Sequence, residues 1–87
     1  MPFLLVRHKV QDFDKWKPVY DTHLGARQSA RLSEKYLLRN LDDPNEVVIL
    51  FEAKDLEKAR EFAASADLRE AMQRAGVEDR PDIYFLE

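Results

Sequence analysis

The side chains best suited to chemistry are two histidines and an arginine. His23 and Arg27 stand four residues apart, so they share one side of a regular helix. An imidazole exchanges protons near neutral pH, and a guanidinium holds a carboxylate or a developing oxyanion. We therefore predict His23 as a general base and Arg27 as an anion holder. The alternative is a structural role at a helix C-terminus, where cations are favoured.

His8 lies in an apolar run, on the same strand face as Leu4 and Val6. A histidine on an apolar face is costly unless it has a partner. Glu52 would be that partner if the two strands are neighbours. The pattern predicts either a pair of His8 and Glu52 that contacts a ligand or a histidine with a purely structural role.

Three further residues complete the predicted ligand-binding set. Trp16 and Tyr20 recur at helical spacing and form an aromatic wall, which is typical of a hydrophobic core as well as of a small pocket. Arg39 is a candidate ligand contact, and a salt bridge at an interface explains it equally well.

The composition excludes several classes of protein. The 87 residues contain no cysteine, two histidines and two glycines, so thiol chemistry, a three-histidine zinc centre and glycine-rich nucleotide loops are excluded. We predict no metal and no cofactor. A net charge of −3 disfavours a nucleic-acid partner. The apolar runs are too short to span a membrane, and no signal peptide is recognisable, so the cytoplasm is the expected location.

Hydrophobic periodicity predicts four strands and two helical sections. The first helix should open with a short turn, restart at Pro18 and end near Gly25. The second section should break at Ser65, restart with Asp67 as the N-cap and end at Gly76. The predicted strands are 2–10, 30–41, 46–53 and 83–86, and the predicted helical segments are 12–25, 55–64 and 67–75.

This order predicts one α+β domain over residues 1–87 with a ferredoxin-like βαββαβ fold. Its four-stranded antiparallel sheet would carry the helices on one face. The strand segments 3–6, 47–51 and 83–86 are apolar at consecutive positions, so both sheet faces must be covered. Because the helices of one chain cover only one face, we predict a homodimer.

Several segments resemble a known superfamily. They are 6–10, 12–23, 39–40 together with 43–48, and 63–72, and they resemble small bacterial proteins of the antibiotic biosynthesis monooxygenase-like, dimeric α/β-barrel superfamily. The resemblance implies a ferredoxin-like dimer with a substrate pocket between helices and sheet. It also implies two kinds of activity, since some members oxidise aromatic substrates without a cofactor and others bind haem through a helix histidine.

The prediction for function is therefore a dimeric protein that binds a small apolar or aromatic molecule, as a cofactor-independent monooxygenase or a cyclase-like enzyme. Two alternatives stay open. One is a ligand-binding or sensory dimer without catalysis, and the other is a haem-binding protein in which His23 is the iron ligand.

Overall fold

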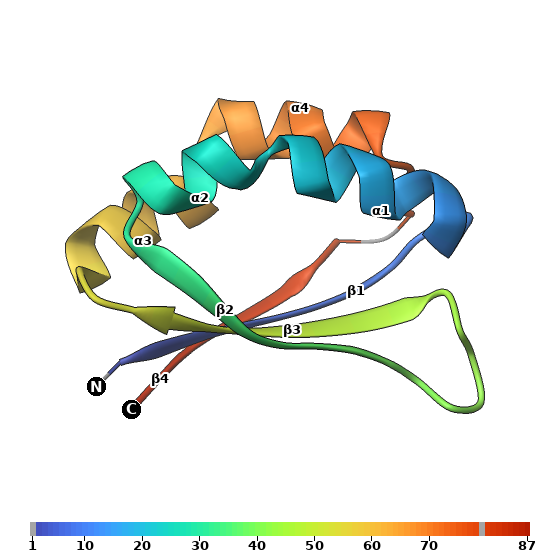
Figure 1. The fold of residues 1–87 in the computed structure, drawn as a ribbon, viewed down its shortest axis with the longest axis horizontal. Helices are drawn as coiled ribbons and strands as arrows, with labels where there is room; N and C mark the ends of the chain where they lie inside the picture. Colours follow the sequence, from blue (N-terminus) through green and yellow to red (C-terminus); the bar gives the residue numbers. More distant parts are fainter. Residues whose placement is uncertain (1, 79) are drawn as a thin grey trace.

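Four antiparallel strands form the sheet that supports the pocket (Figure 1). The computed structural model describes residues 2–78 and 80–87. The strand order is β2-β3-β1-β4, and Phe3 of β1 faces both Glu52 of β3 and Leu86 of β4. The strands are β1 (Phe3–Lys9), β2 (Leu32–Arg39), β3 (Glu46–Ala53) and β4 (Asp82–Leu86).

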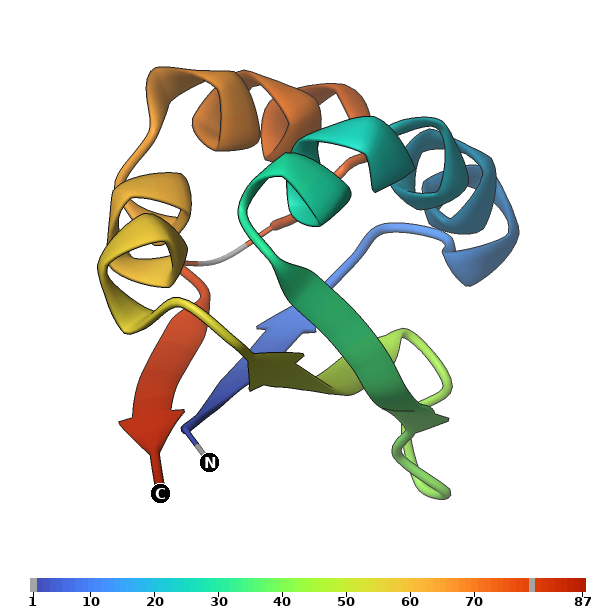
Figure 2. The ribbon, with the colours of Figure 1, turned by 60° about the vertical axis from the view of Figure 1, so that its left-hand side comes forward.

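The helices all lie over one face of this twisted sheet (Figures 1 and 2). The ferredoxin-like α+β arrangement predicted from the sequence is confirmed, with both helical sections split in two. The helices are α1 (Phe13–Thr22), α2 (Leu24–Ser29), α3 (Leu56–Ala63) and α4 (Ala66–Arg74).

The first helical section differs from the prediction in two respects. Pro18 lies inside α1 and does not restart the helix. Its missing N–H removes only the bond to the carbonyl of Asp14, an exposed residue in the first turn where water replaces that donor. The helix then breaks at His23, and α2 runs through Gly25 to Ser29, so the predicted end near Gly25 is wrong.

The start of α4 also differs from the prediction. Ser65 is the N-cap, because its Oγ accepts a hydrogen bond from the backbone N–H of Leu68 at 3.1 Å. Asp67, predicted as the cap, lies in the first turn with its carboxylate free for another partner. The helix ends at Arg74 with Ala75 as its C-cap, and Gly76 follows at φ +79°, in agreement with the predicted stop.

The core lies between the helices and the inner face of the sheet. Every second residue of β1 and β3 is buried there, which is the alternation that a half-covered strand requires. Small residues of the helices, Ala59 and Ala71, let the helical layer approach this face. The buried positions of β1 and β3 are Leu4, Val6, His8, Val47, Ile49, Phe51 and Ala53.

Candidate ligand-binding pocket

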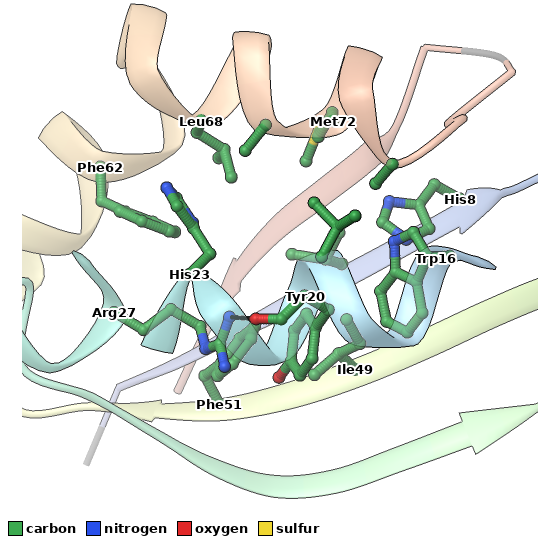
Figure 3. A pocket seen from close by; sticks show the side chains of 14 residues that line it. His8, Trp16, Tyr20, His23, Arg27, Ile49, Phe51, Phe62, Leu68 and Met72 are labelled. Atoms are coloured by element: carbon green, nitrogen blue, oxygen red, sulfur yellow. Dashed lines mark hydrogen bonds between the residues drawn. The ribbon is translucent and has the colours of Figure 1, made fainter. Parts of the chain in front are cut away.

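A pocket lies between the inner face of the sheet and the helical layer (Figure 3). Its cavity measures about 60 Å³, which is room for several water molecules and less than the roughly 150 Å³ that holds benzene in an engineered cavity. Strands β1 and β3 form its floor, α1 and α2 one wall, and α3, α4 and Ala75 the other. It is lined by Val6, His8, Trp16, Val19, Tyr20, His23, Arg27, Ile49, Phe51, Phe62, Leu68, Ala71, Met72 and Ala75.

A second hollow of about 480 Å³ adjoins this pocket on the side of α4 and the start of β4. Leu68 and Met72 line both hollows, so these two side chains form the partition between them. Methionine is unbranched and flexible. Rotation of Met72 would therefore enlarge the pocket without a change in the backbone.

His8 is the buried polar side chain of the pocket floor. It is 4% exposed, and neither ring nitrogen has a hydrogen-bond partner in the described part of the chain. Burial lowers the pKa of His8 to about 4, so the ring is neutral at pH 7. A neutral imidazole offers one donor and one acceptor, and both are left for a bound molecule.

The prediction that Glu52 is the partner of His8 is wrong. The strands β1 and β3 are neighbours, but the antiparallel register places His8 opposite Val47 and Glu52 opposite Phe3, at the other end of the pair. Glu52 forms an ion pair with Lys35 at 3.1 Å. Alternation along β3 also puts Glu52 on the outer face of the sheet, away from the pocket.

The aromatic wall is present as predicted. Trp16 is 2% exposed and stacks on Tyr20 with ring centroids 4.8 Å apart. The His8 ring meets Trp16 edge-on at 5.5 Å. The Tyr20 hydroxyl donates to Glu34 Oε1 at 2.6 Å, and burial together with this bond raises the pKa of Tyr20.

Arg27 lies at the far end of this wall. Its guanidinium stacks on the Tyr20 ring, with Cζ 3.7 Å from the centroid, and Nη1 donates to the backbone carbonyl of Tyr20 at 2.7 Å. That carbonyl belongs to the last turn of α1, so Arg27 also satisfies a helix end. The residue is 6% exposed, and none of the ion pairs found among the described residues includes it.

His23 sits at the junction of α1 and α2 and lines the pocket. Its Nε2 lies 3.0 Å from Asp67 Oδ2 of α4, and its ring packs near Phe62 with centroids 5.9 Å apart. A carboxylate only accepts hydrogen bonds, so this pair favours the tautomer with the proton on Nε2 and leaves Nδ1 as a lone pair. The prediction from the sequence missed the contact of Asp67 with His23, because it assigned the Asp67 carboxylate to the helix cap.

Arg39 lies outside the pocket. Its Nε donates to the carbonyl of Pro44 at 2.8 Å, and its Cζ lies 3.9 Å from the centroid of the Phe13 ring. Arg39 therefore connects the β2–β3 loop to α1. Five of the seven predicted site residues therefore line the pocket, and Arg39 and Glu52 do not.

The outer face of the sheet is apolar and uncovered in the single chain. Tyr36 and Leu38 are 61% and 56% exposed. Arg7 on this face binds both Glu46 and Asp82, and these partners raise the pKa of Arg7. The apolar residues of this outer sheet face are Phe3, Leu5, Tyr36, Leu38, Val48, Leu50, Tyr84 and Leu86.

Two kinds of feature, a metal-binding cluster and a membrane-spanning helix, are absent from the described residues. Residues 2–78 and 80–87 contain no group of three or more His, Cys, Asp or Glu side chains arranged to hold a metal ion. No helix in the same ranges is long and apolar enough to cross a membrane.

Sequence comparison gives no relative, since no family model and no curated protein matches this chain. Solved structures match over nearly the whole chain. An antibiotic biosynthesis monooxygenase-like protein from Bordetella bronchiseptica superposes with a TM-score of 0.77 at 14% identity, over 99% of this chain and 94% of that one. An uncharacterized NIPSNAP domain protein from Burkholderia xenovorans gives 0.69 at 14% identity, over 100% and 93%.

A third match is SnoaB from Streptomyces nogalater, a cofactor-independent oxygenase solved as a single-residue variant. It superposes with a TM-score of 0.68 at 16% identity, over 95% of this chain and 89% of that one. The chain therefore has the fold of the antibiotic biosynthesis monooxygenase-like superfamily, as the sequence resemblance predicted.

Proposed function

We propose that this protein binds a small aromatic molecule in the pocket between helices and sheet and oxidises it with O₂, without a cofactor. The observation that carries the proposal is His8, a buried neutral imidazole on an apolar pocket floor, whose two nitrogens have no hydrogen-bond partner among the described residues. A buried polar group without a hydrogen bond costs about 1–3 kcal/mol. A ligand that hydrogen-bonds to His8 recovers that free energy.

The reaction requires a base, and His23 is the residue we assign to it. Removal of a proton from a phenol or an activated ring carbon gives an electron-rich anion that reduces O₂ directly. In the overall change a ring CH₂ and O₂ give C=O and H₂O, so no other reductant is consumed. Asp67 would hold His23 in the tautomer whose Nδ1 accepts the proton. The fold match to a cofactor-independent oxygenase supports this reaction class.

The size of the pocket limits the ligand. A cavity of about 60 Å³ is too small for several fused rings. A single ring requires the lining side chains to move apart, because even benzene occupies a cavity of roughly 150 Å³. A larger molecule would require Met72 to move so that the pocket joins the second hollow.

Haem does not fit this site. The cavity of about 60 Å³ is far smaller than a porphyrin. We therefore do not assign the haem-binding alternative.

We propose that the working unit is a homodimer formed through the outer sheet face. A face that is apolar across all four strands is unusual for a monomer. Its charged side chains balance in sign, so an identical copy meets no net charge of its own sign; they are Arg7, Lys9 and Lys35 against Glu46, Glu52 and Asp82. These two properties favour a second copy as the occupant of this face.

A specific observation favours a second candidate function, ligand binding without turnover. Asp67 and the Tyr20 carbonyl already engage the polar groups of His23 and Arg27. In that case the protein would bind and release its ligand unchanged.

The test is thermal unfolding against a ligand panel, followed by oxygen uptake. The panel holds hydroquinones, anthrone-like phenols, amino acids, haem and divalent metals. A ligand at a hundredfold excess over its Kd stabilises the folded state by about 2.7 kcal/mol. Phenolic ligands should raise Tm and consume O₂. A Tm shift without O₂ uptake would support the binding function, and no shift with any aromatic ligand would contradict both.

A further inference from the structure

Four pocket side chains form a continuous row from β1 to α2 (Figure 3). The His8 ring contacts Trp16 at 5.5 Å, Trp16 stacks on Tyr20 at 4.8 Å, and Arg27 stacks on Tyr20 at 3.7 Å. Trp16 and Arg27 cover the two faces of the Tyr20 ring, so this stack lines the pocket with apolar ring edges. The two ends of the row are chemically different, since one is an imidazole and the other a guanidinium.

The Arg27 end carries a buried positive charge. A guanidinium has five N–H donors, and the protein acceptor identified for Arg27 is the carbonyl of Tyr20. No carboxylate forms an ion pair with Arg27 within the described ranges, although the residue is 94% buried. Burying a charge is costly unless it is paired. An anionic group on a ligand would supply the missing partner.

The His8 end offers hydrogen bonds without charge. Neither of its nitrogens has a partner among the described residues, and its neighbours Trp16 and Val6 are apolar. A charged ligand group would have to lose its hydration here with no opposite charge to compensate. An uncharged hydroxyl or carbonyl would be accommodated at much lower cost.

We infer that the pocket selects an elongated ligand with two unlike ends, an anionic group held by Arg27 and an uncharged hydroxyl or carbonyl group held by His8. This inference rests on the proposed binding function and names its ligand class as aromatic carboxylates that carry a hydroxyl or keto group at the opposite end. Trp16 and Tyr20 hold the ring between these ends.

Three one-ring probes test the inference: 4-hydroxybenzoate, 4-hydroxybenzamide and benzoate. The amide keeps the shape of the first compound and removes its charge, and benzoate removes the hydroxyl. Trp16 is the only tryptophan and lies in the pocket wall, so its fluorescence reports occupancy. Thermal unfolding provides a second readout that does not depend on fluorescence.

We expect 4-hydroxybenzamide to bind about tenfold more weakly than 4-hydroxybenzoate, because it loses a charge-assisted hydrogen bond. The difference should persist in Arg27→Lys and disappear in Arg27→Gln. Benzoate should bind several-fold more weakly than 4-hydroxybenzoate, about the effect of one hydrogen bond, and this difference should disappear in His8→Phe. Arg74→Gln, an exposed residue on α4, is the matched control and should preserve both differences.

Equal affinity for the carboxylate and the amide in the unmodified protein would overturn the inference and leave the binding function standing. That comparison needs no variant, so a misfolded Arg27→Gln protein does not affect it. If none of the three probes changes either Trp16 fluorescence or Tm, the result counts against the inference and against the proposed function together.

Discussion

The carboxylate of Asp67 and the imidazole of His23 connect the two halves of the helical layer, with Oδ2 3.0 Å from Nε2. The connection exists because Ser65 caps α4 and leaves Asp67 uncommitted. It fixes one nitrogen of His23 at the edge of the pocket. The side chain of Asp67 is 69% exposed, so the pair orients His23 more than it stabilises the fold.

The Asp67→Asn variant should therefore lose activity and keep the thermal stability of the unmodified protein. An amide N–H facing Nε2 favours the opposite tautomer of His23, so O₂ uptake should fall at least about tenfold while Tm changes little. The ¹⁵N chemical shifts of the imidazole report the tautomer directly, without a substrate. Glu70→Gln, on the same helix, is the control. An unchanged His23 tautomer in Asp67→Asn would contradict the positioning role.

His8 should make stability depend on pH. Its pKa is lowered to about 4 in the folded protein, against about 6.5 in the unfolded chain, so the unfolded state binds the proton first as pH falls. The contribution is fully present above pH 6.5, and about 3 kcal/mol is lost between pH 6.5 and pH 4. Urea unfolding of the wild type and His8→Leu, at one protein concentration, measures the difference. Parallel pH profiles would refute the buried neutral state.

The outer sheet face makes a prediction about assembly. Leu50→Lys puts a charge in the middle of this face and should convert a dimer into a monomer, because an unpaired buried charge is costly. Leu41→Lys is the control, since Leu41 is fully exposed and lies outside the strands. Sedimentation velocity distinguishes the two states. A wild-type monomer at micromolar concentration, or a dimer that survives Leu50→Lys, would count against this interface.

Met72 lines both hollows, so we predict that its side chain limits the size of the ligand. Met72→Ala removes part of the partition between the two hollows, so a two-ring phenol should gain affinity relative to a one-ring phenol. The variant should lose about 2–3 kcal/mol of stability, since the side chain is only partly buried. Calorimetric titration with both ligands measures the ratio. An unchanged ratio would mean that Met72 does not divide the space.

The sequence predicted the fold because its local signals agree with one another. Apolar strands, the turn at Asp43–Asn45 and the cap at Asp55 all specify the same arrangement, and each is present in the structure. The helix boundaries were harder to place. Pro18 is tolerated inside α1, and Gly25 adopts a helical conformation, because tertiary packing outweighs their weak local preferences.

The sequence allowed a prediction of most residues that line the pocket, but not of which of these residues contact one another. Helical spacing correctly grouped His23 and Arg27 with the aromatic wall. Strand register decided that His8 faces Val47 instead of Glu52, and no local pattern determines register. The contact of Asp67 with His23 joins residues 44 positions apart, which periodicity does not reveal.

The central claim is that His8 hydrogen-bonds to a ligand inside the pocket. The chain has two histidines, so their imidazole signals are assignable in a two-dimensional NMR spectrum with and without 4-hydroxybenzoate. The account predicts that the His8 signals shift and saturate at the same ligand concentration as the Trp16 fluorescence. Saturable binding that leaves the His8 signals in place would contradict it.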